Sequence, residues 1–154
     1  MKLLLGAAVA LSLSGCATVP QGPTAPRGPT APQGPSAADK LRGLSFAEIG
    51  ERAEYNAKFL QSKTEQALID ASLEATRNQL KDPGSAQFRN VRLVQHPKGK
   101  VVCGEMNAKN SYGGYVGFKV FAASPLGATI QQTGGRYAEV DALANSGLRA
   151  TCVY

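Results

Sequence analysis

The chain has one histidine and three cysteines among its 154 residues, which limits the chemistry that it can perform. The histidine, His96, precedes Pro97 in a predicted turn, where a solvent-exposed residue is expected. One histidine and cysteines far apart in the chain give no metal-ligand spacing. No G-x-S-x-G, H-E-x-x-H or Walker motif is present. Glu105 with Glu139 or Asp141 would supply the two carboxylates of a glycosidase, but carboxylates at arbitrary spacing are weak evidence for one. We therefore expect a protein that is not an enzyme and that has no metal or cofactor.

The sequence also lacks a membrane-spanning run, because its N-terminal apolar segment, residues 3–13, is about half of the roughly 20 residues that a spanning helix needs. The segment follows Lys2 and ends in Ser14-Gly15-Cys16, in the order of a signal peptide: charged start, apolar centre and small residues. This arrangement resembles the lipobox of bacterial lipoproteins. The resemblance implies that Cys16 is lipidated, is the first mature residue and anchors the protein to a membrane. An ordinary secretory peptide with an unrelated cysteine is the alternative.

In the lipoproteins that this segment resembles, an aspartate after the cysteine usually means retention in the inner membrane. Ala17 stands there in this chain. The resemblance therefore predicts that the protein is held at the outer membrane, on its periplasmic face.

The charge is basic but scattered. Lys and Arg outnumber Asp and Glu by 17 to 11, without a run of five basic residues and without a helix-turn-helix or aromatic RNA-binding signature. We expect no nucleic-acid partner. A basic surface also suits peptidoglycan carboxylates, lipid phosphates or an acidic protein, so the charge indicates no specific partner. The predicted envelope location favours an envelope protein or peptidoglycan as the partner. The oligomeric state is left open.

Residues 20–38 contain most of the nine prolines and almost no bulky apolar side chain. Such a segment cannot bury enough surface to offset the entropy lost on ordering. In the extended polyproline II form, at about 3.1 Å per residue, it would reach on the order of 50–60 Å. We predict three parts: a signal peptide over residues 1–15, a lipidated and disordered tether over 16–38, and a single domain over 39–154.

Cys103 and Cys152 remain once Cys16 is lipidated, and an even pair is typical of a disulfide in an oxidising compartment. The bridge would close a loop of about 50 residues and contribute about 4 kcal/mol. Two buried thiols and a metal site are the alternatives.

Helical signals begin at Ser45, which with Glu48 forms a potential capping box and predicts a helix from Phe46. The helical pattern continues to about Leu80. A second potential box, from Ser62 to Glu65, favours two helices, and one continuous helix is the alternative. The sequence Asp-Pro-Gly at 82–84 then ends it.

Short β-rich runs follow. Residues 88–95 and 100–107 predict a hairpin, residues 115–123 and 128–132 two further strands, and residues 137–146 a helix that ends at Gly147. A last strand over 150–153 would carry Cys152. The predicted class is α+β: an N-terminal helical segment packed on a small antiparallel sheet, with a short C-terminal helix and last strand.

The candidate binding loop joins the second and third predicted strands. It combines amide and lysine donors with two tyrosines around a glycine pair, a composition that recognition loops favour. A tight connection without a ligand is the alternative, because Asn and Gly tolerate left-handed backbone. The candidate residues are Asn107, Lys109, Asn110, Tyr112, Gly113, Gly114 and Tyr115.

Three stretches of the domain, KDPGSAQFRNV at 81–91, VCGEMNAKN at 102–110 and GGYVGF at 113–118, are similar to a family of small exported bacterial proteins of unassigned function. The resemblance extends over residues 80–121 and implies no activity. The function predicted from the sequence is a membrane-anchored periplasmic lipoprotein that acts as an interaction or scaffold module of the envelope. The alternative is an inhibitor or immunity-type protein that binds a periplasmic toxin or cell-wall enzyme.

Overall fold

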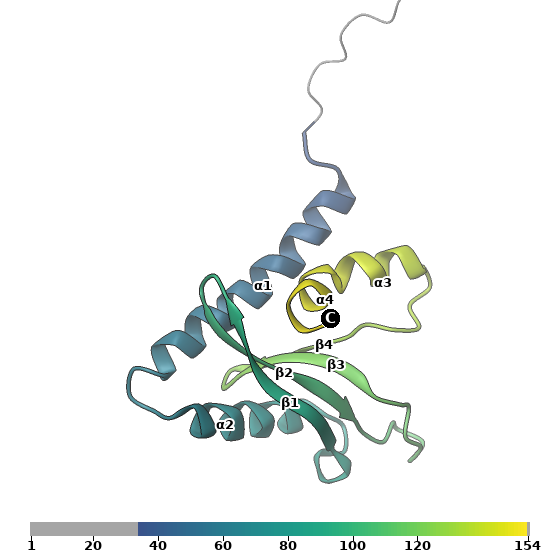
Figure 1. The fold of residues 1–154 in the computed structure, drawn as a ribbon. Helices are drawn as coiled ribbons and strands as arrows, with labels where there is room; N and C mark the ends of the chain where they lie inside the picture. The colour runs from purple at the N-terminus through teal and green to yellow at the C-terminus, as the bar shows by residue number, and fades with distance from the viewer. Residues whose placement is uncertain (1–33, 154) are drawn as a thin grey trace, which may run out of the picture. The chain divides into compact units, whose positions relative to one another are not determined.

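The computed structural model describes residues 34–153, so the predicted signal peptide, Cys16 and most of the predicted tether lie outside the described residues. Four helices, one 3-10 turn and a four-stranded antiparallel sheet of order β1-β2-β3-β4 make an α+β fold, as predicted (Figure 1). No helix within 34–153 is long and apolar enough to cross a membrane. The elements are α1 (Ala37–Phe59), α2 (Glu65–Asn78), η1 (Pro83–Ser85), β1 (Gln87–His96), β2 (Gly99–Asn107), β3 (Lys119–Ser124), β4 (Gly127–Ile130), α3 (Ala138–Ala144) and α4 (Ser146–Cys152).

Helix α1 begins nine residues before the predicted start at Phe46. Its N-cap is Ser36, whose hydroxyl accepts a hydrogen bond from Asp39 N–H while the Asp39 carboxylate accepts one from Ser36 N–H, each at 3.2 Å. The prediction of Ser45 as the cap was wrong. Ser45 is buried inside α1, where its hydroxyl bonds with backbone groups of the C-terminal helices instead.

The helical segment is divided into two helices, which is one of the two predicted alternatives. The cap of the second helix is Thr64 rather than Ser62 of the predicted box, because the Thr64 hydroxyl accepts a hydrogen bond from Ala67 N–H at 3.1 Å. Helix α2 ends at Asn78, close to the predicted end, and Pro83 then starts the η1 turn.

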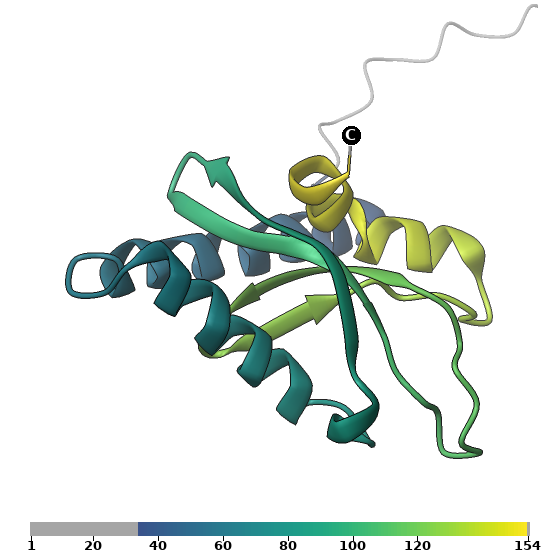
Figure 2. The same ribbon diagram turned by 60° about the horizontal axis from the view of Figure 1, so that its bottom comes forward.

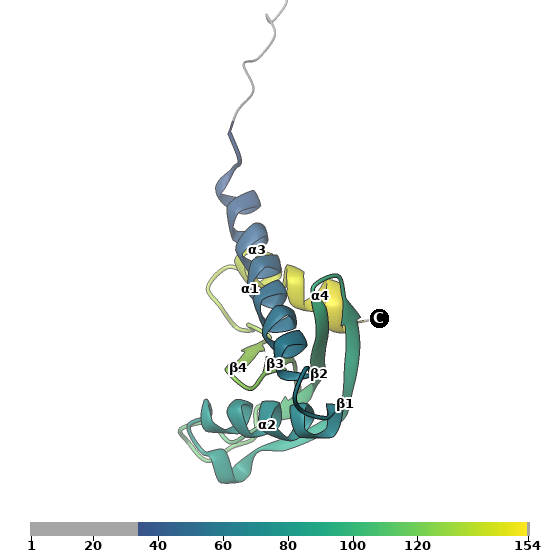
Figure 3. The same ribbon diagram turned by 90° about the vertical axis from the view of Figure 1, so that its left-hand side faces the viewer.

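Helices cover both faces of the sheet (Figure 3). One core lies between α1, α4 and the first face, and a second core lies between α2 and the opposite face. Neighbouring strand residues divide between the cores because their side chains alternate. The first core contains Ile49, Ala53, Val101, Cys103, Ala122, Leu148 and Cys152, and the second contains Leu68, Val102, Met106, Ala108, Phe121, Ala123 and Ala128.

Strands β1 and β2 form the predicted hairpin, which extends as a long twisted ribbon (Figure 2). Its register pairs Arg89 with Glu105 and Arg92 with Cys103, so β1 carries one extra residue between them. Asn90 lies in this bulge with φ 54°, the one left-handed residue other than glycine in the described part of the chain. The bulge bends the strand next to Glu105.

Strand β3 starts at Lys119, four residues later than predicted. Gly117 has φ 93°, a left-handed conformation that a continuous strand does not accommodate. The predicted alternation holds from Lys119 onward, because Val120 packs on the first core and Phe121 lies in the second. It does not extend back to Tyr115.

The C-terminal prediction was partly wrong. The helix expected over residues 137–146 is the shorter α3, and the expected strand over 150–153 is helical, since α4 extends to Cys152. Gly147 does not end a helix but lies within α4. Leu148 and Cys152 are four residues apart, which places both on the buried side of α4.

Candidate functional site

The tip of the candidate loop is a tight turn built around Asn110. Its side-chain oxygen accepts hydrogen bonds from Tyr112 N–H at 2.9 Å and Gly114 N–H at 3.1 Å. Two backbone hydrogen bonds close the same turn, from Asn110 N–H to the Gly114 carbonyl and from Gly113 N–H to the Asn110 carbonyl. Gly113 is left-handed, with φ 81°. A tight turn, which needs no ligand, is therefore enough to account for Asn110, Gly113 and Gly114 in this loop.

The turn is also attached to the η1 segment. Lys109 N–H donates to the Ser85 hydroxyl at 3.0 Å, and the Tyr115 hydroxyl donates to the Ser85 carbonyl at 3.3 Å. On the other side, the Lys81 ammonium donates to the Ser111 hydroxyl at 2.8 Å. These contacts hold the loop in one position against the domain.

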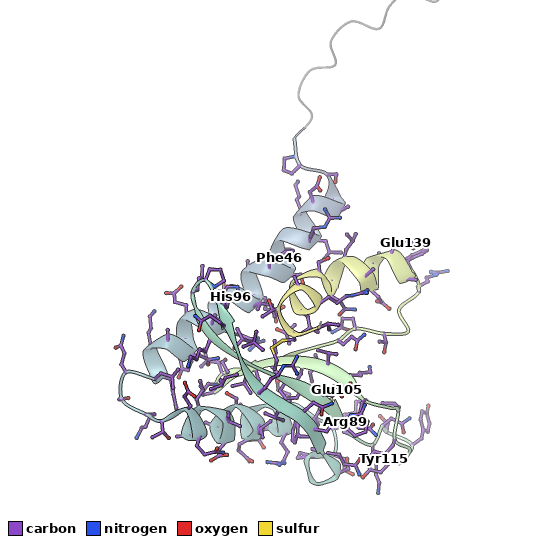
Figure 4. The ribbon with its side chains drawn as sticks, viewed as in Figure 1. Phe46, Arg89, His96, Glu105, Tyr115 and Glu139 are labelled. Atoms are coloured by element: carbon purple, nitrogen blue, oxygen red, sulfur yellow. A yellow bond between two sulfur atoms is a disulfide. The ribbon has the colours of Figure 1, made fainter. Side chains whose placement is uncertain are left out.

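Side chains on the loop differ in exposure. Tyr112 is 96% exposed, and Tyr115 and Val116 are 46% and 56% exposed. Asn107 is instead buried at the end of β2, so its side chain is not available to a partner. We call the exposed side chains of Tyr112, Tyr115 and Val116 together the loop surface. Figure 4 shows the position of Tyr115.

A pocket of about 260 Å³ lies beside the loop. Lysines from three segments line it: Lys81 after α2, Lys109 after β2, and Lys119 at the start of β3. We call it the lysine pocket. Of the three lysines, Lys109 alone was predicted from the sequence, because the other two line the pocket with it only in the folded chain. The remaining lining residues are Gln79, Leu80, Met106, Ala108, Asn110, Val116, Gly117 and Ile130.

A larger pocket of about 620 Å³ lies on the first face of the sheet, beside the bulge. Glu105 lines it and accepts hydrogen bonds from Arg89 and Asn90, both at 2.8 Å, and these bonds lower the pKa of the Glu105 carboxyl. The Arg89 guanidinium also stacks over the Phe118 ring, 3.7 Å from its centroid. Arg92 donates to the Cys152 carbonyl at 2.6 Å. The charged side chains beside this pocket therefore already interact with other groups of the protein.

The residues considered for catalysis do not come together. Glu105 and Glu139 lie on different elements, well apart in Figure 4. Asp141 accepts a hydrogen bond from Gly135 N–H at 2.9 Å, and His96 Nδ1 accepts one from Lys98 N–H at 3.2 Å. Residues 34–153 contain no group of three His, Cys, Asp or Glu side chains placed to hold a metal ion.

Cys103 and Cys152 lie at disulfide-bonding distance, with their Cα atoms 5.5 Å apart. The pair connects α4 to the central strand β2, within the first core. The predicted pairing is therefore matched by the fold, although Cys152 reaches it from a helix.

Comparison of the chain with protein families, curated proteins and solved structures finds no match. The case for a function therefore rests on the residues of this chain.

Proposed function

We propose that this chain is a lipid-anchored protein of the bacterial envelope, without enzymatic activity, whose folded domain binds a partner through the loop surface. The observation that carries the proposal is the contrast between a fixed backbone and exposed aromatic side chains. Asn110 and Ser85 hold the loop by four hydrogen bonds, yet Tyr112 is 96% exposed.

A loop that is already ordered loses little conformational entropy when it binds. Tyrosine adds a large, rigid contact area with a polar end, and such residues dominate recognition loops. The loop surface therefore has the backbone order and the side chains that a protein-binding site requires.

Two observations, on the N-terminal sequence and on the cysteine pair, support the proposed location. The lipobox residues ending in Cys16 support lipid anchoring, and the proximity of Cys103 to Cys152 supports an oxidising compartment such as the periplasm. With Ala17 after the lipidated cysteine, the outer membrane is the proposed site of attachment.

An inhibitor or immunity-type protein is the second candidate. The projection of Tyr112 from a fixed turn favours it, because a rigid loop suits insertion into the cleft of a toxin or cell-wall enzyme. The two candidates differ in the number of partners: an inhibitor forms a one-to-one complex, and a scaffold contacts several envelope components.

In-cell crosslinking of the full chain followed by mass spectrometry tests the proposal. The double variant Tyr112→Ala/Tyr115→Ala should lose the captured partners, and Tyr137→Ala, which removes a tyrosine that is 60% exposed before α3, should retain them. Cys16→Ala should release the protein from the membrane fraction.

One dominant enzyme or toxin among the captured proteins would select the inhibitor, and several assembly proteins or peptidoglycan would select the scaffold. Capture that is unchanged in the double tyrosine variant would contradict binding through the loop surface. A Cys16→Ala protein that stays with the membrane would contradict the lipid anchor.

A further inference from the structure

Three lysines, Lys81, Lys109 and Lys119, are among the residues that line the lysine pocket. No Asp or Glu is among the residues that line it in the described part of the chain. Like charges around one space reinforce each other's potential and attract an anion. The lysines therefore favour a ligand that carries a negatively charged group.

The rest of the lining is largely apolar. Leu80, Met106, Val116 and Ile130 contribute side chains to it, and all but Val116 pack with the second core. An inorganic anion would leave this surface without a partner. The lining therefore suits a ligand that carries an aliphatic part beside its charge.

Two of the three lysines are held by neighbouring groups. The Lys81 ammonium is bonded to the Ser111 hydroxyl, and the Lys109 ammonium lies 5.7 Å from the centroid of the Tyr115 ring. These contacts restrict the two lysine side chains before a ligand binds. The side chains therefore lose less conformational entropy on binding. The same loop that presents the tyrosines thus positions part of the pocket.

The volume narrows the class of ligand further. Pockets for drug-sized ligands measure about 300–1,000 Å³, and this one, at about 260 Å³, lies just below that range. It accommodates the end of a chain rather than a folded surface. The larger pocket is the weaker candidate, because Arg89, Asn90 and Glu105 already bond with one another there.

We infer that the lysine pocket binds a short peptide that ends in a free carboxylate, with the carboxylate near the lysines and small aliphatic residues on the apolar lining. This inference rests on the proposed function and names the chemistry that its partner presents. Such a peptide end occurs in cell-wall stem peptides, which end in D-residues, and in the C-terminal tails of proteins, which end in L-residues.

Fluorescence anisotropy with the full chain in detergent tests this inference. The probes are fluorescein-labelled tripeptides that end in D-Ala-D-Ala or L-Ala-L-Ala, each as the free acid and as the C-terminal amide. We expect one acid to bind about fivefold more tightly than its amide, and we expect salt at about 1 M, where the Debye length is about 3 Å, to weaken binding.

The variant Lys109→Gln/Lys119→Gln should weaken binding of the acid about fivefold. The matched control is Lys40→Gln/Lys63→Gln, which removes the same charge from exposed positions in α1 and before α2, and it should bind like the original chain. As a second variant, Val116→Asp places a carboxylate at a position that is 56% exposed and should abolish binding of the acid.

Preference for the D-ended acid would identify the cell wall as the source, and preference for the L-ended acid would identify a protein tail. Equal affinity for acid and amide, no binding of any probe, or full binding by Lys109→Gln/Lys119→Gln would overturn the inference. If no peptide binds but crosslinking to partners still depends on Tyr112, the inference about the lysine pocket is wrong and the proposed function stands. If no peptide binds and crosslinking does not depend on Tyr112, both the inference and the proposed function are wrong.

Discussion

The Ser45 hydroxyl accepts a hydrogen bond from Gly147 N–H at 2.9 Å and so joins α1 to α4 across 102 residues of chain. The same hydroxyl donates to the Ala144 carbonyl at 2.6 Å. A Cβ atom at Gly147 would overlap the backbone of Ser45. The two helices therefore meet backbone to backbone, and this contact positions the helix that carries Cys152.

Gly147→Ala should destabilise the domain by about 1–3 kcal/mol, because the added methyl group must displace α1, which outweighs the gain in helix propensity of about 1 kcal/mol. Ser45→Ala should cost a similar amount, about 2 kcal/mol, since it leaves two backbone groups without their partner. Denaturant unfolding measures both. Arg149→Ala, at an exposed position of α4, is the control and should change stability little. A stabilising Gly147→Ala would contradict the contact.

The misplaced start of α1 follows from this same contact. Ser45 and Glu48 have the spacing of a capping box, but spacing alone does not distinguish a serine that caps a helix from one that bonds another helix. The actual cap is Ser36, which bonds with Asp39. Ser36 lies at the end of the proline-rich repeats, so the composition of that segment led to its prediction as part of the tether. The hairpin was predicted well because its turn residues and strand pattern are local signals.

The cysteine pair should be oxidised if the protein is in the periplasm, as proposed. Thiol labelling of the unreduced protein should then modify neither Cys103 nor Cys152, and both should react after reduction in denaturant. Replacing both by serine should lower the free energy of unfolding by about 4 kcal/mol, the value for a loop closed across 49 residues. Labelling of either cysteine in the native, unreduced protein would show that the bond does not form.

Asn110→Ala should loosen the loop without unfolding the domain, because the lost side-chain oxygen is the acceptor for two backbone N–H groups on an exposed turn. Hydrogen exchange at Tyr112 and Gly114 should become faster, while exchange in β2 stays slow. Asn110→Asp keeps an oxygen acceptor and should retain the original exchange rates at both residues. If the exchange rates at Tyr112 and Gly114 in Asn110→Ala equal those of the original chain, the backbone hydrogen bonds alone hold the turn.

The loop was predictable in its composition, whereas the lysine pocket was not. Asn110, Gly113 and Gly114 form a local turn whose signal lies within nine residues of sequence. Lys81 and Lys119 are 38 positions apart in the chain, and they line one pocket only because the fold brings the segment after α2 close to the start of β3. Such a site depends on the sheet register and on the end of α2, which local patterns do not specify.

The ion pair of Glu105 with Arg89 should make stability depend on pH in the acid range. Hydrogen bonds from Arg89 and then from Asn90 lower the pKa of the folded Glu105 carboxyl below its value in the unfolded chain. The unfolded state therefore binds more protons in acid, and the stabilisation is present above the unfolded pKa and is lost as the pH falls through the folded one. Glu105→Gln should lower the free energy of unfolding at neutral pH, and the difference from the original chain should shrink as the pH falls below about 5 and through the folded pKa. Glu51→Gln, which removes an exposed carboxylate of α1, is the control and should not converge in this way. A constant difference between Glu105→Gln and the original chain from pH 7 to pH 3 would contradict this role for the ion pair, because an interaction with the charged form alone must vanish when that carboxyl is protonated.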